Sequence, residues 1–252
     1  MAKTSQPAIK SLKFGDLSAS LSAGWRDFLR APLFGLFFSS FYVLCGLALT
    51  LLGAGTLEWT VLLSLGFPLV APFAAVGLYE VSRRLERGES LRWREILGAV
   101  WQERARQAPW IGAILVIVFL FWSFFAHMSF ALFLGHMPLT NITTSWETFN
   151  TFNGIAMILF QFATGALVAW LVFSITVVSL PLLLEREVDF VSAMLISMRA
   201  VGSNRGVMLM WAAVIAVLIF VAMAPLFLGL LVALPVLGHA TWHLYRRTIE
   251  PV

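Results

Sequence analysis

The sequence predicts an all-α, polytopic membrane protein with six transmembrane helices, and three observations support that fold class. Hydrophobic residues make up 60% of the 252 residues and charged residues only 12%, whereas about 25% of a soluble domain is charged. Long runs without a charged residue recur along the chain, and the mean hydropathy is +0.89. The basic residues gather between those runs, where the positive-inside rule places cytoplasmic segments.

The N-terminal segment 1–31 is expected to be cytoplasmic and to contain an amphipathic helix. It lacks the short apolar core of a signal peptide. Between Leu17 and Leu29, apolar residues recur at helical spacing, so this helix is expected on the membrane surface with Asp16 or Ser18 as its cap. Three charged residues fall off the apolar stripe: Arg26, Asp27 and Arg30.

Two uncharged runs, 33–52 and 59–79, predict the first two spans. Each is long enough to cross a hydrocarbon core about 30 Å thick at about 1.5 Å per residue. Prolines are expected to kink the spans, and a kinked helix can either pack against its neighbours or line a solute pathway. The candidate pathway kinks are Pro68, Pro72, Pro181 and Pro235.

The basic segment 80–110 separates the second and third spans and sets the predicted orientation. Its second half is amphipathic, and two tryptophans and two arginines there form a candidate surface for lipid headgroups or a partner. These residues are Trp93, Trp101, Arg92 and Arg94. Glu80 is expected to form an interfacial ion pair with Arg83 and Arg84 at helical spacing, and a proton-binding role is the alternative.

The second half of the chain predicts four more spans. The runs 111–134 and 154–184 are the third and fourth, and an amphipathic stretch with Asp189 as its N-cap follows. The run 207–245 would be about 58 Å long as one helix, roughly twice the membrane core. It therefore predicts two spans joined by a turn at 223–227.

The distribution of positive charge orients the six spans. With both termini inside, every Lys and Arg is cytoplasmic, and the outer turns near Glu58, Glu147 and Pro225 have none. The membrane domain then covers 32–247, with a cytoplasmic tail at 248–252. Three times an amphipathic helix leads into a hairpin of two spans, which suggests parallel repeats.

The histidines are the main candidate ligands. His239 and His243 are four residues apart and share a helix face. They can hold a metal or haem, or they can lie at the membrane interface with Trp242 and Tyr245 in an aromatic belt. His127 lies in the third span, toward the opposite side of the membrane, so its depth argues against a common site.

No catalytic machinery is visible, and the expected protein is not an enzyme. No charged residue falls at the predicted midplane of a span, and Walker A, HExxH and GxSxG patterns are absent from the sequence. Three functions remain: a non-enzymatic subunit or assembly factor of a membrane complex, a channel or transporter for a small solute such as an anion, and a haem- or metal-binding protein. The first is preferred, with membrane lipids rather than nucleic acid as binding partners.

Four stretches resemble a bacterial family of predicted six-span integral membrane proteins of unknown function. They are GLYEVSRRLERGE (77–89), Trp93-Arg94-Glu95, SLPLLLEREVDFVSAM (179–194) and GHATWHLYR (238–246). The resemblance implies a multi-span protein of the bacterial cytoplasmic membrane with no established activity. Some members are labelled as similar to a cytochrome oxidase subunit, but this sequence lacks the set of histidines that a haem-copper subunit needs.

Overall fold

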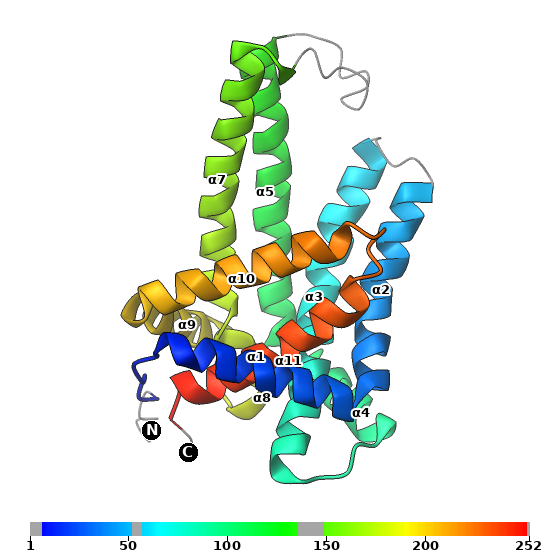
Figure 1. Ribbon diagram of the computed structural model, residues 1–252, viewed down its shortest axis with the longest axis vertical. Helices are drawn as coiled ribbons and strands as arrows, with labels where there is room; N and C mark the ends of the chain where they lie inside the picture. The colour runs from blue at the N-terminus through cyan, green and yellow to red at the C-terminus, as the bar shows by residue number, and fades with distance from the viewer. Residues whose placement is uncertain (1–6, 52–56, 136–148, 251–252) are drawn as a thin grey trace.

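The protein is all-α in the residues that the computed structural model describes, 7–51, 57–135 and 149–250 (Figure 1). The helices, in chain order, are α1 (Phe14–Arg30), α2 (Pro32–Leu51), α3 (Leu57–Arg87), α4 (Trp93–Glu103), α5 (Ala108–Leu134), α7 (Phe152–Thr176), α8 (Ser179–Glu185), α9 (Phe190–Ser203), α10 (Arg205–Met223) and α11 (Leu230–Thr248). The shorter helices α1, α4 and α9 each precede a pair of longer ones, in the order that the sequence predicts.

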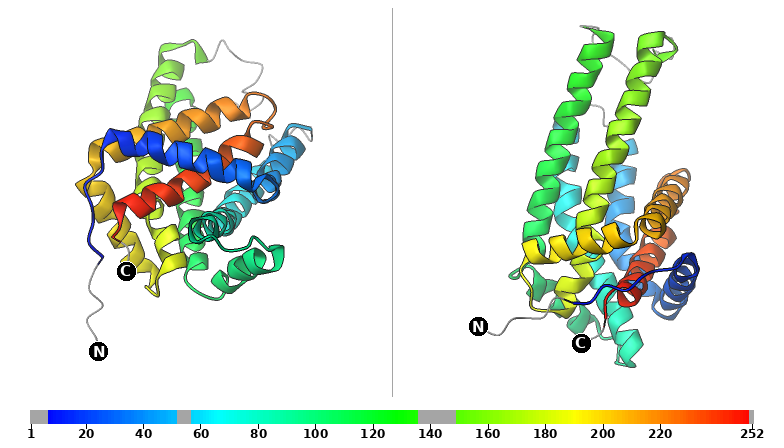
Figure 2. Two further views of the ribbon diagram at one scale, coloured as in Figure 1. Left: turned by 60° about the horizontal axis from the view of Figure 1, so that its bottom comes forward. Right: turned by 90° about the vertical axis from the view of Figure 1, so that its left-hand side faces the viewer.

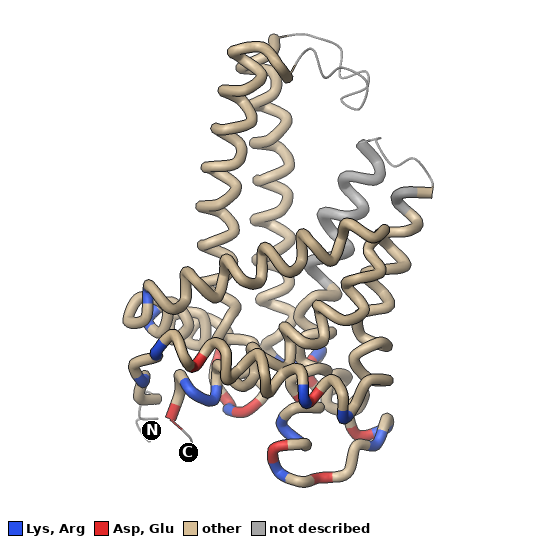
Figure 3. Tube along the Cα trace, in the orientation of Figure 1, with Lys and Arg blue, Asp and Glu red and all other residues tan. Residues whose placement is uncertain are grey.

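The long helices rise from a common base. Two pairs, α2–α3 and α5–α7, point away from the end of the molecule where both termini lie (Figure 1). The charged residues that Figure 3 colours gather at that end, and the outer parts of α5 and α7 carry none (Figure 3). We call this charged end the base of the protein.

The third pair lies differently. Helix α10 runs across the α5–α7 pair instead of alongside it, and α11 descends obliquely to the base between α1 and α3 (Figures 1 and 2). Among the described residues, three helices are long and apolar enough to cross a membrane: Ala108–Leu134, Phe152–Glu185 and Arg205–Met223. The pair Phe14–Arg30 and Pro32–Ala48, bent by 100°, is a fourth candidate if it counts as one span.

Helix α1 begins one turn before the caps that the sequence suggests. Lys13 is the N-cap residue, and Asp16 acts from the third helical position by accepting a hydrogen bond from the Lys13 N–H at 2.8 Å. The helix ends at Arg30, because Pro32 follows and favours an extended residue before it. Ala31 supplies that break, and α2 leaves at a bend of 100°.

The predicted fourth span corresponds to the apolar stretch Phe152–Glu185, which a short turn at 177–178 divides into two helices. Helix α7 ends at Thr176 and α8 starts at Ser179. Pro181 explains the break, because its nitrogen has no hydrogen to donate to the carbonyl of Val177 and its ring clashes with that carbonyl. The N–H of Val178, left without a helical partner, donates to the Ser197 hydroxyl of α9 at 3.1 Å.

We expect Ser197→Ala to lower the free energy of unfolding by about 1–3 kcal/mol, because the buried N–H of Val178 then has no acceptor. Thermal unfolding in detergent, followed by tryptophan fluorescence, measures this change. Ser203→Ala at the exposed end of the same helix is the control and should have an effect within about 0.5 kcal/mol. Equal effects of the two substitutions would contradict a role for Ser197 at the break.

The two ends of the described chain pair at the base. Ile9 and Ile249 form an antiparallel bridge, and the Lys10 N–H donates to the Thr248 carbonyl at 2.8 Å. Asn204 at the start of α10 joins this contact, since its side-chain oxygen accepts from the Leu12 N–H at 2.7 Å. The N-terminal segment is thereby held to α10 and α11.

Candidate functional site

Helices α1, α3 and α11 cross closely at the base because glycines lie at their contacts. A Cβ atom placed on Gly24 of α1 would lie 2.6 Å from both the Ala240 nitrogen and the Val236 carbonyl oxygen of α11. A Cβ atom on Gly238 of α11 would lie 2.6 Å from a methyl group of Leu78 on α3. These approaches bring the polar side chains of the three helices within hydrogen-bonding distance.

Four side chains meet at this crossing: Asp27 of α1, Ser82 of α3, and His239 and His243 of α11. We call them the crossing network. The Asp27 Oδ2 atom lies 2.8 Å from the Ser82 hydroxyl and 2.7 Å from His243 Nε2. The Ser82 oxygen also lies 2.8 Å from His239 Nδ1. Asp27, Ser82 and His239 are buried, and His243 is partly exposed.

The direction of the hydrogen bonds in the crossing network indicates its chemistry. The Ser82 O–H donates to the Asp27 carboxylate, so the Ser82 oxygen accepts from the Nδ1–H of His239. In a Ser–His–Asp triad the histidine lies between the other two and takes the serine proton. Here the serine lies between the histidine and the carboxylate, and its proton faces the carboxylate instead of an imidazole nitrogen. This arrangement ties α1, α3 and α11 together and differs in order from a Ser–His–Asp triad.

The carboxyl group of Asp27 is held in its charged form. Burial alone would raise its pKa, but hydrogen bonds from His243 and Ser82, with the charge interactions of both histidines, outweigh burial and lower the pKa below 3.8. The sequence reasoning placed Asp27 on the polar face of a surface helix, and the structure corrects this. One signal was available, because Asp27 follows Gly24 by three residues and therefore lies on the same helix face.

The histidines and aromatic residues of α11 do not form an interfacial belt, which corrects one reading of the sequence. His239, Trp242 and Tyr245 are fully buried within the protein. His127 lies apart on α5, where its Nδ1 is 2.7 Å from the Ser123 carbonyl oxygen. Within the described ranges, no group of three or more His, Cys, Asp or Glu side chains is arranged to hold a metal ion.

Three further residues of the 238–246 motif join α11 to α3 and α8. The indole N–H of Trp242 donates to Glu86 at 3.1 Å, and Tyr245 donates to Glu185. Arg246 bridges both carboxylates, with its Nε 3.1 Å from Glu86 and its Nη1 2.7 Å from Glu185. The motif that carries the family resemblance therefore holds the base together.

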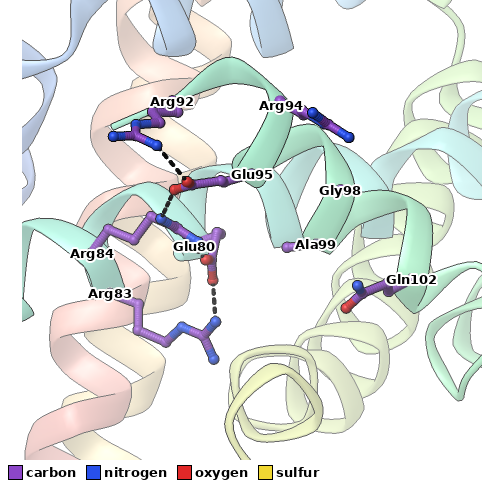
Figure 4. A pocket seen from close by; sticks show the side chains of 9 residues that line it. All are labelled: Glu80, Arg83, Arg84, Arg92, Arg94, Glu95, Gly98, Ala99 and Gln102. Carbon is purple, nitrogen blue, oxygen red and sulfur yellow. Dashed lines mark hydrogen bonds and ion pairs between the residues drawn. The ribbon is translucent and has the colours of Figure 1, made fainter. Parts of the chain in front are cut away.

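A cavity of about 530 Å³ lies between α3 and α4 at the base (Figure 4). We call it the arginine cavity, and its lining residues are Glu80, Arg83, Arg84, Arg92, Arg94, Glu95, Gly98, Ala99 and Gln102. Glu80 is fully buried and lies 2.6 Å from Arg83 and 2.7 Å from Arg84, the pairing that its spacing predicts. Glu95 pairs with Arg84, and with Arg92 at 3.6 Å.

The two tryptophans of the candidate lipid or partner surface have different surroundings. Trp93 packs on α2, with its ring centroid 4.1 Å from that of Phe34 and 5.2 Å from that of Phe37. Trp101 is 62% exposed, and the Arg104 guanidinium lies 3.1 Å from its ring centroid. Trp93 therefore fastens α4 to the first helix pair, and Trp101 remains on the surface.

The candidate pathway prolines do not line the arginine cavity. Pro72, Pro181 and Pro235 are buried in helix packing, and the side chain of Pro68 lies outside the described residues, as does that of Glu58. Helix α3 continues through Pro68 and Pro72 from Leu57 to Arg87.

Ser82 is a further site residue that sequence reasoning missed, because one serine beside a basic stretch carries no distinguishing pattern.

Comparison with known proteins gives one match. The model of a family described as "Predicted integral membrane protein (DUF2189)" matches residues 60–185, half of the chain. The matched range contains α4, α5, α7 and α8 with most of α3, and therefore the whole arginine cavity. No curated protein and no solved structure matches the chain.

Proposed function

Because the chain belongs to the DUF2189 family of predicted integral membrane proteins, we propose that it is a non-enzymatic subunit or accessory factor of a membrane complex. The proposed topology has six spans in the bacterial cytoplasmic membrane, with both termini on the cytoplasmic side and α10–α11 as a strongly inclined third pair. The gathering of the described charges at the base supports this orientation, because positive residues favour the cytoplasmic side (Figure 3).

The α5–α7 pair is the observation on which the proposal rests. Its outer part stands clear of the other described helices (Figures 1 and 2). Gln161 of α7 faces α5, since it donates to the Ser129 hydroxyl at 2.7 Å and to the Ala126 carbonyl at 3.2 Å. Its exposed residues are mostly apolar, with Phe121 72% exposed and Phe162 78% exposed, and they include one histidine, His127.

Much of the apolar surface of this pair is not covered by other helices of the described chain. In lipid, helices associate through close packing and interhelical hydrogen bonds rather than through the hydrophobic effect. At the base, α11 packs against α1, α2 and α3, whereas the outer part of α7 has only α5 as a neighbour among the described helices. The helices of another protein would complete the packing of this pair.

The crossing network supports a non-enzymatic role. The Asp27 carboxylate accepts hydrogen bonds from Ser82 and His243, so the Ser82 proton is directed to Asp27. General acid–base catalysis needs a group free to exchange a proton with a substrate. The network instead joins α1, α3 and α11 into one unit.

A photo-crosslinking residue at Phe162 tests the proposal in native membranes. We expect a discrete protein adduct, and native mass spectrometry of the gently extracted complex should give a mass above the 28.0 kDa chain by a second polypeptide. The same residue at Phe220 of α10, also 78% exposed, is the control and should yield mainly lipid adducts. Only lipid adducts at both positions, with a mass of 28.0 kDa or its multiples, would refute the proposal.

A further inference from the structure

The arginine cavity has an excess of positive charge that the protein does not neutralise. Four arginines line it against two glutamates. Both carboxylates already form ion pairs. Glu80 pairs with Arg83 and Arg84, and Glu95 pairs with Arg84 and Arg92. Arg92 has a side chain 72% exposed, and its one ion pair spans 3.6 Å. The side chain of Arg94 forms no hydrogen bond or ion pair with any other residue in the part of the chain that the structure describes.

The walls of the cavity leave space for a ligand. Gly98 and Ala99 present almost no side chain to it, and a Cβ atom added to Gly98 would meet nothing within 4 Å. Gln102 lies one turn beyond Gly98, and its amide adds a neutral donor (Figure 4). Guanidinium groups bind phosphoryl oxygens through paired, charge-assisted hydrogen bonds. A phosphoryl group matches both the charge and the donors of this space.

Helix α4 also places an apolar edge beside the cavity. At about 100° per residue, Leu97 and Trp101 lie on one side of Arg94, and Gly98 and Gln102 lie on the other. Leu97 and Trp101 are exposed, and Trp93 of the same edge packs on α2. A ligand with a charged head and an apolar tail can therefore use both sides of Arg94 at once.

We propose that the arginine cavity binds the phosphoryl headgroup of an anionic phospholipid, with Arg92, Arg94 and Gln102 as donors and the acyl chains along Leu97 and Trp101. This site does not depend on the proposed partner of α5–α7, because it lies at the base on other helices. Free inorganic phosphate shares the headgroup chemistry but would not use the apolar edge.

Native mass spectrometry of delipidated full-length protein with added phosphatidylglycerol tests the site. We expect the double variant Arg92→Gln, Arg94→Gln to bind the lipid about 30-fold more weakly, since each of the two basic residues contributes about 1 kcal/mol. The matched control Arg26→Gln, Arg30→Gln removes the same charge from exposed positions of α1 and should change binding less than about twofold. Equal loss in the two double variants would overturn the proposal.

A variant that blocks the space without changing charge tests the shape of the cavity. Gly98→Leu projects into open space and should weaken phosphatidylglycerol binding while α4 stays folded, because leucine favours helix more than glycine does. An unchanged unfolding temperature confirms that the fold is retained. Phosphatidylcholine should bind weakly to all forms, and excess inorganic phosphate should compete only in part. Full competition by phosphate would identify free phosphate as the ligand, and equal binding of the two lipids would overturn the site.

Discussion

Replacing Gly24 with alanine should lower the free energy of unfolding by about 1–3 kcal/mol, because the new methyl group enters a filled space. The nearest atoms are a backbone nitrogen and a backbone oxygen of α11, each 2.6 Å from the Cβ position. Neither can move aside as a flexible side chain would. Helix α1 must therefore shift outward, and the hydrogen bonds of Asp27 weaken with it.

Gly15→Ala is the matched control for this prediction. Gly15 lies on the same helix, and a Cβ atom there would meet nothing within 4 Å. Since alanine favours helix over glycine by about 1 kcal/mol, this substitution should be neutral or stabilising. Thermal unfolding in detergent and limited proteolysis near α1 compare the two variants. The close contact of α1 with α11 would be disproved by equal stability of both.

Replacing Asp27 with alanine should lower the free energy of unfolding by about 3 kcal/mol, because Ser82 and His243 lose their shared acceptor. A buried donor without a partner costs about 1–3 kcal/mol. Asp27→Asn keeps the shape and one acceptor oxygen, so its effect should be smaller. The matched comparison is Asp16→Ala, whose partly exposed carboxylate pairs with Arg247 at 3.1 Å and should contribute about 1 kcal/mol or less.

The pH dependence of the Asp27 effect follows from its lowered pKa. The charged carboxylate stabilises the folded state at every pH above the unfolded-state value near 3.8. As the pH falls from there through the lower folded-state pKa, that stabilisation is lost. The stability difference between the natural protein and Asp27→Asn should therefore shrink as the pH falls below about 3.8. A difference that grows in acid would contradict this role.

The sequence predicted features that depend on local pattern. The α5 helix, the Asp189 cap and the ion pairs of Glu80 are present as expected, since each follows from hydrophobicity or from spacing within one helix. The all-α class and the membrane character follow in the same way from composition. These signals need no knowledge of which helix lies beside which.

Contacts between helices that are far apart in the chain could not be predicted from the sequence. Asp27 and His243 are far apart in the chain. No local pattern around either residue indicates that the two side chains meet where α1 crosses α11 at Gly24. Trp242 and Tyr245 suggested a membrane interface because aromatic residues favour that region, but hydrogen bonds to Glu86 and Glu185 place them inside the base. The crossing of α10 over α5–α7 likewise depends on tertiary packing.

The packing of α1 on α11 has a consequence for biogenesis. Helix α1 leaves the ribosome well before α11 is synthesised, yet Gly24 packs on α11 and Asp27 needs His243 of α11 as well as Ser82 of α3. Until α11 is synthesised, the face of α1 that packs on α11 is therefore without its partner. The base closes only after α11 has emerged, so a ribosome that stalls within α10 leaves a nascent chain with α1 exposed to chaperones and membrane proteases.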